Sequence, residues 1–217
     1  MENSDSLKSK RTTVKRLAKR GVYDRETVYD IFDEALICHV GFIVNGIPMV
    51  LPTIHGRVGD NLYLHGSIGS QMLRASLNDI EISISATIVD GIVLARSLFN
   101  HSMNYRSAVV IGKAALVKDD EEKVLALKAM SDHVLKQRWE DARLPNEKEL
   151  AQTMIVKVSI SEGSAKIRTG PPGDDAEDMS LDIWAGVIPI QTIKAPPISA
   201  PDLRNGIAFP EYLKAFN

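Results

Sequence analysis

The chain lacks the features that mark secreted, membrane-spanning or nucleic-acid-binding proteins. Its single cysteine, Cys38, excludes an intramolecular disulfide. No stretch of about twenty apolar residues exists, so we expect no transmembrane helix. The 26 basic and 28 acidic residues give a formal net charge of -2, which argues against a general nucleic-acid or anionic-membrane surface. These absences, and the lack of an apolar signal-peptide core near Met1, favour the cytoplasm.

Common catalytic and metal-binding motifs are also absent. None of the 5 histidines forms a compact ligand pair, so we expect no metal site. The sequence has no Gly-x-Ser-x-Gly, no Walker loop and no Gly-x-Gly-x-x-Gly, which argues against hydrolases with a nucleophile elbow, P-loop enzymes and Rossmann domains. Cys38 lies in an apolar run, which favours a buried structural thiol over a nucleophile.

What is present fits one medium-sized folded domain. The 217 residues are 44% hydrophobic and 25% charged, which is an ordinary globular composition. Residues 1–20 carry a basic run with few apolar residues and are interpreted as a solvated N-terminal arm. Residues 21–195 hold the patterned segments. Residues 196–217 contain several prolines and are predicted to form an extended C-terminal tail.

Hydrophobic patterning predicts a mainly antiparallel sheet with a few helices. A helix capped by Asp24 is followed by β-type runs at 37–44, 49–55, 62–65, 81–89, 92–96 and 105–117. Tight-turn dipeptides at Asn45-Gly46, Gly59-Asp60 and Asp90-Gly91 indicate hairpins. Helices at 119–135 and 147–153 and strands at 154–161, 164–168 and 183–189 follow. The expected fold is α+β, with the sheet closing toward a barrel and helices outside it.

One segment suits an anion. The apolar strand Leu62 to His65 runs into a turn of glycines and serines that leads to a helix, and amides at a helix start attract phosphate. Ser67 and Ser70 can add hydroxyl donors, although the same turn also occurs as a plain connector. His65, at the strand end, is suited to donate to a ligand or is simply satisfied by backbone.

Two further places suit a flat, anionic ligand. Arg106 offers a planar fork for phosphate beside the hydroxyl of Ser107, although an arginine at a strand start is often a surface residue. Trp184 precedes two small residues, so its ring is free to stack on a planar ligand or to fill a core. The strand at 81–89 has one face of small polar residues, suited to a wet interior or an interface.

Taken in order, several stretches resemble the flavin-nucleotide-binding proteins related to pyridoxamine 5'-phosphate oxidase, including the nitroimidazole-resistance type. The matching stretches are 20–25, 46–53, 62–67, 104–107 with Gly112, 164–168 and 184–189. The resemblance implies a split β-barrel homodimer with FMN at the subunit interface. It also implies a small-molecule substrate or electron donor, whereas the charge balance leads us to expect no nucleic-acid or membrane partner.

The resemblance assigns roles to the candidate residues. Backbone groups of Pro52, Thr53 and Ile54 would face the isoalloxazine edge. The phosphate and ribityl chain would be held by His65, Gly66, Ser67, Ser70 and Gln71. Arg106 and Ser107 would add to this pocket, and Trp184 would close it from the other subunit.

One departure narrows the expected activity. True pyridoxamine phosphate oxidases carry an Arg-Lys pair where this chain has Ser70-Gln71, and the Arg-x-His-Asp-Arg-like element expected after Trp184 is missing. We therefore expect an FMN-dependent oxidoreductase of unknown substrate, with nitroreduction as a subordinate hypothesis, and not a vitamin-making oxidase. Two alternatives remain open: a non-enzymatic FMN-binding protein, and a haem-binding or haem-degrading split barrel. The candidate axial ligands of the latter are His39, His55, His65 and His101.

Overall fold

The structure, a computed structural model, describes residues 6–77 and 80–216. Its helices are α1 (Arg25–Glu34), α2 (Gln71–Ser76), α3 (Asp120–Val134), α4 (Arg138–Asp141) and α5 (Glu147–Gln152). Short 3-10 turns are η1 (Ala18–Arg20), η2 (Leu98–Asn100), η3 (Asp178–Ser180) and η4 (Glu211–Phe216). The strands are β1 (Gly21–Val22), β2 (Cys38–Val44), β3 (Ile47–Thr53), β4 (His55–Val58), β5 (Asn61–Ser67), β6 (Glu81–Leu94), β7 (Ser102–Leu116), β8 (Thr153–Ser159), β9 (Gly163–Arg168) and β10 (Gly186–Pro189). The predicted α+β class is confirmed.

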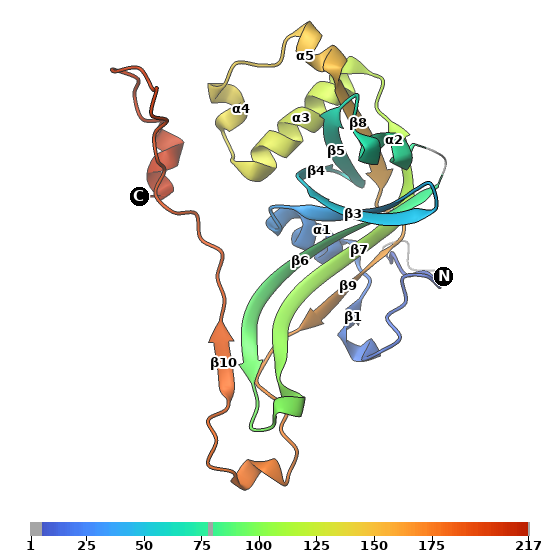
Figure 1. Cartoon of the computed structure of the whole chain (residues 1–217), viewed down its shortest axis with the longest axis vertical. Helices are drawn as coiled ribbons and strands as arrows, with labels where there is room; N and C mark the ends of the chain where they lie inside the picture. The colour runs from blue at the N-terminus through green and yellow to red at the C-terminus, as the bar shows by residue number, and fades with distance from the viewer. Residues whose placement is uncertain (1–5, 78–79, 217) are drawn as a thin grey trace.

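The strands form one antiparallel sheet that stays open. Its order is β3-β2-β6-β7-β8-β5-β4, with β9 and β10 added alongside β7 and β6 (Figure 1). β3 and β4 are consecutive in the chain, yet β3 pairs with β2 whereas β4 pairs with β5. The two halves of the sheet therefore curl around a shared core without closing into a complete barrel.

Two apolar clusters hold the helices to the sheet. Asp24 caps α1 by accepting a hydrogen bond from the Thr27 amide at 2.8 Å, and Val28, Ile31 and Phe32 bury one helical face in the main cluster. α3 covers the other face of β4 and β5 through a second cluster that contains Ala126, Met130, Tyr63 and Ile155. The helices thus lie on the sheet surface, as the patterning predicts.

The predicted hairpin at Asp90-Gly91 is wrong. β6 continues through this dipeptide, and its register with β7 shifts between Val89 and Gly91, which marks a bulge instead of a turn. The true turn lies at 95–101 and contains η2. A Cβ added at Gly91 would lie 3.0 Å from the Ile188 carbonyl oxygen, so glycine here lets β10 approach β6.

The predicted strand at 49–55 is also divided. β3 ends at Thr53 and β4 begins at His55, and the two strands belong to opposite ends of the sheet path. Ile54 forms the link between them. This division lets a single apolar run contribute to both halves of the fold.

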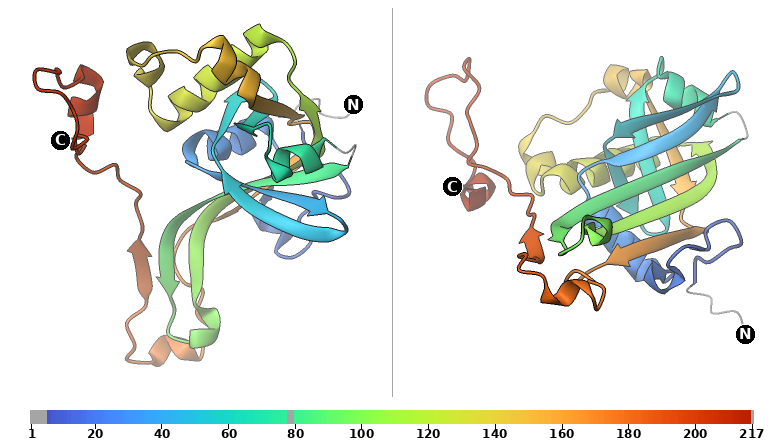
Figure 2. Two further views of the ribbon diagram at one scale, coloured as in Figure 1. Left: turned by 45° about the horizontal axis from the view of Figure 1, so that its top comes forward. Right: turned by 60° about the horizontal axis from the view of Figure 1, so that its bottom comes forward.

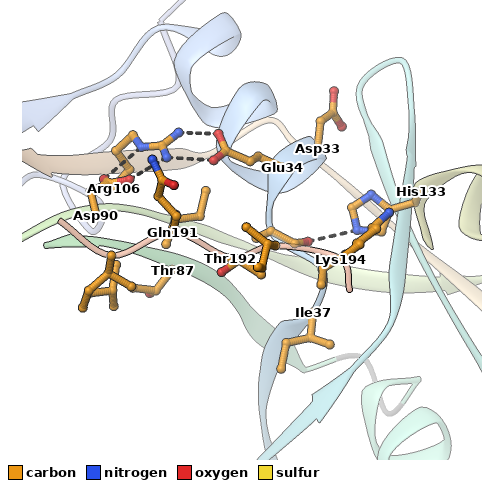
Figure 3. Close-up of a pocket in the computed structure, with 16 residues that line it drawn as sticks. Asp33, Glu34, Ile37, Thr87, Asp90, Arg106, His133, Gln191, Thr192 and Lys194 are labelled. Atoms are coloured by element: carbon orange, nitrogen blue, oxygen red, sulfur yellow. Dashed lines mark hydrogen bonds and ion pairs between the residues drawn. The ribbon is translucent and has the colours of Figure 1, made fainter. Parts of the chain in front are cut away.

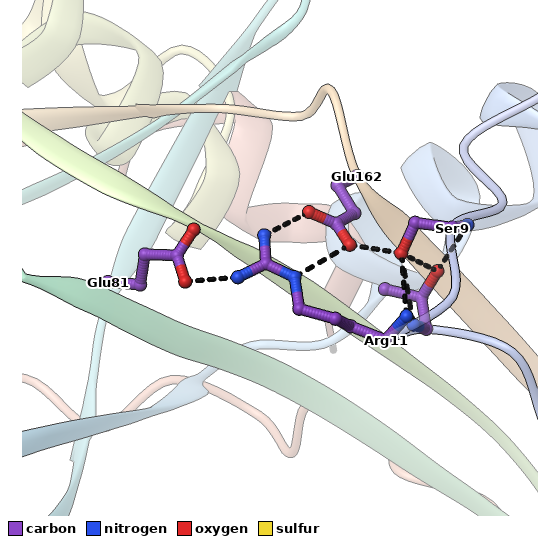
Figure 4. A network of polar contacts seen from close by, with 5 residues as sticks. Ser9, Arg11, Glu81 and Glu162 are labelled. Atoms are coloured by element: carbon purple, nitrogen blue, oxygen red, sulfur yellow. Dashed lines mark hydrogen bonds and ion pairs between the residues drawn. The ribbon is translucent and has the colours of Figure 1, made fainter.

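The N-terminal arm is partly packed, which differs from the predicted solvated arm. Leu7 is 1% exposed, and its backbone bonds to the Tyr23 carbonyl and the Gly163 amide. Arg11 joins the arm to the sheet by donating to carboxylates of Glu81 and Glu162 (Figure 4). The lysines of the described arm that stay exposed are Lys8, Lys10, Lys15 and Lys19.

After β10 the chain leaves the sheet and runs alongside it as an extended segment (Figures 1 and 2). We call residues 190–216 the C-terminal arm. Lys194 Nζ donates to the Val134 carbonyl at 2.9 Å, and the Tyr212 hydroxyl donates to Asp141 at 2.7 Å, so the arm is fastened at α3 and α4. In the part of the chain that the structure describes, no helix has the length and apolarity to cross a membrane.

Candidate functional site

The predicted anion turn is formed between β5 and α2. The Ser70 amide donates to the Ser67 carbonyl at 2.9 Å, and Ser70 Oγ caps α2 by accepting from the Leu73 amide at 3.4 Å. A Cβ at Gly66 would lie 3.2 Å from Leu73 Cδ1, so glycine lets α2 pack closely on β5. Ser67 and Gln71 are exposed. The turn therefore presents polar groups on a rigid strand-to-helix junction.

His65 lies on β5 beside this turn. Side chains alternate along a strand, so His65 and Ser67 share the face that Tyr63 presents to α3, whereas Gly66 faces α2. His65 Nδ1 is buried and has no hydrogen-bond partner among the described residues. Burial lowers the pKa of this imidazole, which keeps it neutral at physiological pH. Ile54 precedes His55, which pairs with Leu64, and so lies next to His65.

Arg106 and Ser107 point to opposite faces of β7. The Arg106 guanidinium donates to Asp90 at 3.0 and 2.7 Å and to Glu34 at 2.8 Å, with a further bond to the second Glu34 oxygen (Figure 3). These pairs raise the pKa of Arg106 and hold the pKa of Glu34 below its usual value. Arg106 thus joins α1 to the β6 bulge, and its fork is already occupied by carboxylates.

Ser107 belongs to a different surface, which we call the open face. It is the side of β3, β2, β6 and β7 that turns away from the main cluster, and the polar and small side chains on it are His39, Pro52, Ser83, Ser85, Thr87 and Ser107. The alternate residues, such as Val40, Ile84 and Val110, are fully buried. The open face therefore carries a row of hydroxyls along β6, as the pattern at 81–89 predicts, with Val109 and Ile111 of β7 beside them.

The outer part of the open face is unusually apolar for a free surface. Every residue from Ile47 to Pro52 is exposed; Val50, at 64%, lies on the open face opposite Gly41, whereas Ile47, at 60%, lies opposite Val44 on the other face of β3. Pro48 and Pro52 lie four residues apart on this edge strand and point the same way, where the missing amides would otherwise face the free edge. β3 is thus protected against addition of another strand, while its apolar side chains remain uncovered.

Trp184 lies far from the anion turn. It belongs to the loop before β10 at one end of the molecule, whereas α2 lies toward the other end (Figure 1). Its side chain is 66% exposed, and its ring covers Gly186, where an added Cβ would come within 2.8 Å of the ring. Phe99 at 90% and Leu98 at 84% exposure occupy the turn at this same end of β6 and β7. A single chain does not bring Trp184 to the other predicted site residues.

A cavity of about 810 Å³ lies between the C-terminal arm and the body (Figure 3). Its walls come from the end of α1, from residues 87–90 of β6, from His133 on α3 and from residues 190–194 of the arm. Arg106 is the one predicted site residue on its wall. No motif in the sequence pointed to His133 or to the arm, because this cavity is formed by segments distant in the chain.

The remaining histidines differ in accessibility. His55 is fully buried; its Nε2 lies 2.7 Å from the Phe32 carbonyl oxygen, which only accepts hydrogen bonds, so Nε2 carries the proton. Burial, followed by the neighbouring His133 ring at 4.4 Å, lowers the pKa of His55 to about 4. His101 Nε2 donates to the Ala95 carbonyl at 3.1 Å, whereas His39 is exposed on the open face. His55 is therefore enclosed, and His39 is accessible.

Two further expectations from the sequence concern the thiol of Cys38 and metal binding. Cys38 is buried, and burial raises its pKa to about 12, which makes it the structural thiol that its apolar surroundings predict. Within residues 6–77 and 80–216, no group of three or more His, Cys, Asp or Glu side chains is arranged to hold a metal ion.

Comparison with known proteins identifies similar chains. The family model described as pyridoxamine 5'-phosphate oxidase matches residues 24–167. The flavocytochrome Anf3 from Azotobacter vinelandii is 38% identical, with a TM-score of 0.91 over 98% of this chain and 99% of that one. The FAD and heme binding protein from Mycobacterium smegmatis is 35% identical, with a TM-score of 0.86 over 91% of this chain and 97% of that one.

A third structure matches a smaller part. The putative 5-nitroimidazole antibiotic resistance protein from Bacteroides thetaiotaomicron is 25% identical, with a TM-score of 0.58 over 68% of this chain and 86% of that one. The matched share is close to that of the family model, whereas the two haem-associated structures match nearly the whole chain. A comparison with curated proteins found no match.

Proposed function

This chain belongs to the pyridoxamine 5'-phosphate oxidase family, with its split-barrel fold, and on that basis we propose that it is a flavin-binding redox protein that also takes up haem. The observation that carries the proposal is the nearly full-length match, at 38% and 35% identity, to a flavocytochrome and to an FAD- and haem-binding protein. When bound, a flavin supplies hydride and electron transfer and a haem supplies one-electron chemistry. The protein supplies binding, orientation and electrostatics.

The open face is the proposed flavin surface. Along β6 its side chains are small and carry hydroxyls, so a flat ring can lie against this strand without a steric clash while polar edges find hydrogen-bonding groups. Ser107 and Thr87 lie opposite each other on neighbouring strands and carry two such hydroxyls; that of Ser107 donates to the Lys166 carbonyl at 3.3 Å and can still accept a hydrogen bond. The chemistry of this face therefore fits an isoalloxazine.

We propose that a second copy of the chain completes the site. The exposed apolar side chains of β3 need a cover, and Pro48 and Pro52 leave side-chain packing as the way to provide it. Trp184, which one chain leaves exposed at its far end, would then close the flavin pocket of the other copy. A homodimer brings together residues that the single chain keeps apart.

The other candidate residues take distinct roles in this proposal. Pro52, Thr53 and Ile54 present backbone groups to the ring edge, and His65, as a neutral imidazole, offers a hydrogen bond there. The turn residues hold the phosphate and ribityl chain; they are Gly66, Ser67, Ser70 and Gln71. Arg106 acts as a positioning residue, because its guanidinium is bound by Glu34 and Asp90 and holds the strand that carries Ser107.

FAD is the flavin we propose, following the Mycobacterium smegmatis relative, with FMN as the form implied by the sequence resemblance. The two flavins share the isoalloxazine ring and the first phosphate, so both would contact the same residues. Titration of the full-length protein with each flavin, followed by quenching of flavin fluorescence, distinguishes them. The proposal predicts tighter binding of FAD, and equal or tighter binding of FMN would assign the site to FMN.

A substitution on the open face tests where the flavin binds. Ser85→Leu places a bulky side chain on the open face and should weaken flavin binding by at least about tenfold, while Ser9→Ala, on the N-terminal arm, should not. Unchanged binding by Ser85→Leu would move the flavin away from the open face.

Nitroreduction is the second candidate activity, favoured by the match to the nitroimidazole-resistance structure over the family region. Its test is turnover of a nitroimidazole by the flavin-loaded protein that dithionite has reduced. A protein that binds flavin but is not reduced by NADH or NADPH in stopped-flow mixing, and does not reduce nitro compounds, would be a binder without these activities.

A further inference from the structure

The cavity beneath the C-terminal arm combines apolar walls with a lysine that no carboxylate of the described residues pairs with. Its apolar wall includes Leu36 and Ile37 after α1, Ile88 and Val89 on β6, and Ile193 on the arm. Thr87, which belongs to the open face, also lines it, so the cavity adjoins the proposed flavin surface. A ligand here would lie next to the proposed flavin surface.

Each acidic residue on the wall is paired with an arginine, but Glu34 and Asp90 share Arg106, so this triad keeps a net charge of -1. Glu34 and Asp90 both bind Arg106, and Asp33 binds Arg57 through Nε at 2.8 Å (Figure 3 shows the first pair). An anion would therefore meet no free carboxylate in this cavity.

Lys194 is the exception among the charges of the wall. Its ammonium group donates to the Val134 carbonyl at 2.9 Å and lies 5.5 Å from the Phe216 ring, and no carboxylate of the described residues pairs with it. A carbonyl satisfies one of its three donors. The cavity thus presents apolar walls and one cation with spare donors, which favours a ligand with an apolar body and an acidic edge.

His133 is the one histidine among the 16 residues that line the cavity. Its Nε2 lies 2.9 Å from the Ala35 carbonyl oxygen; because a carbonyl only accepts, Nε2 carries the proton and Nδ1 carries the lone pair. Histidines that ligate metals usually donate their other ring N–H to a carbonyl or carboxylate, and either ring nitrogen can serve as the ligand. The imidazole is therefore held in a tautomer that can ligate a metal.

The matches to the haem-associated relatives extend over more of this chain than the other matches do. The flavocytochrome matches 98% of this chain and the FAD- and haem-binding protein 91%, whereas the nitroimidazole-resistance structure matches 68%, close to the extent of the family model that ends at residue 167. The C-terminal arm lies beyond that model and forms one wall of the cavity.

From these observations we infer that the cavity beneath the C-terminal arm is the haem site, with a propionate on Lys194, the porphyrin against Leu36, Ile37 and Ile193, and His133 as the iron ligand. This inference rests on the proposed function. It assigns the haem to a histidine outside the four candidates that the sequence suggested. It also gives the arm a role, since the arm supplies both Lys194 and part of the apolar wall.

The test is titration of the full-length protein with hemin, followed by the Soret band, and with iron-free protoporphyrin IX, followed by fluorescence. Lys194→Gln keeps a donor for Val134 and removes the charge, and should weaken binding of both porphyrins by about tenfold. Lys136→Gln is the matched control, because Lys136 lies near α3 but does not line this cavity, and should bind as the wild type does.

Ligation is tested separately. His133→Ala should bind protoporphyrin IX normally but should change the Soret maximum of bound hemin, and added imidazole should restore the wild-type spectrum. Should the variant unfold, His133→Gln gives the same readout with a side chain closer in size. Thermal unfolding of each variant separates loss of fold from loss of ligand.

The outcomes divide clearly. Hemin binding with unchanged affinity in Lys194→Gln and an unchanged spectrum in His133→Ala would overturn the inference and leave the proposed function intact. Loss of the spectrum in His39→Ala, His65→Ala or His101→Ala instead would place the iron at that residue. Flavin binding without any hemin binding by the wild type would refute the haem part of the proposed function together with this inference.

Discussion

At the scale of single residues, neighbours in sequence serve different purposes because a strand turns them to opposite faces. Arg106 faces α1 and binds Glu34 and Asp90, whereas Ser107 faces the open side of the sheet beside Thr87. The family resemblance placed Arg106 and Ser107 in one pocket. The sequence alone does not show that the two side chains point to opposite faces of the strand. The structure separates a structural role from a proposed binding role.

This separation predicts opposite phenotypes for the two residues. Arg106→Leu leaves two carboxylates close together without their cation and should lower the free energy of unfolding by about 1–3 kcal/mol. Ser107→Ala should change stability by less than about 0.5 kcal/mol but should weaken flavin binding. Urea unfolding and flavin titration of both variants measure the two effects. Equal stability loss in both variants would contradict the assignment.

His55 makes stability depend on pH. Its folded pKa of about 4 lies below the ordinary value of 6.5, so between these values the unfolded chain binds a proton that the folded protein does not. Stability should therefore fall as the pH falls from 6.5 toward 4, by about 3 kcal/mol at most. His55→Gln removes this titration. Urea unfolding at pH 7.5 and 4.5 should show a smaller loss for the variant, and an equal loss would refute the account.

At the scale of elements, local patterns predicted most helices and strands. Asp24 caps its helix by accepting a backbone N–H bond, as the sequence predicts, and Asp119 and Asn146 cap two further helices in the same way. Asp90-Gly91 misled the prediction, because the same dipeptide suits a turn and a bulge. What decides between them is the approach of β10, about a hundred residues later, which a local pattern does not contain.

The packing of α3 on β4 gives a test at this scale. A Cβ at Gly56 would lie 2.8 Å from the Met130 amide nitrogen and 3.0 Å from the Ala129 carbonyl carbon, so Gly56→Ala must push the helix outward. We expect a loss of about 1–3 kcal/mol in the free energy of unfolding. Gly173→Ala, where nothing lies within 4 Å, is the control and should be nearly neutral. A neutral Gly56→Ala would show that α3 is loosely held.

At the scale of the whole molecule, the exposed apolar surfaces are the observation behind the proposed homodimer. β3 and the end that carries Trp184 and Phe99 are both uncovered, and they lie on different parts of one chain. The α+β class and the family could be inferred from sequence, because strand patterns and motif order are local. The cavity beneath the arm could not be inferred, because α1, α3, β6 and residue 194 meet there only in three dimensions.

The proposed homodimer leads to a prediction about β3. Val50→Glu puts a charge on an apolar face that we expect to be buried between two copies, and the variant should sediment as a monomer. Ile198→Glu changes a residue that is 97% exposed on the C-terminal arm and should leave the dimer intact. Sedimentation velocity compares them. A dimeric Val50→Glu variant, or a monomeric wild type, would be incompatible with the proposed interface.

The most direct test of the central claim is the visible absorption spectrum of the full-length protein after incubation with FAD, FMN and hemin and removal of unbound cofactor. The account predicts flavin bands together with a Soret band, each at about one cofactor per chain. A colourless protein with no retained flavin and no Soret band would contradict it.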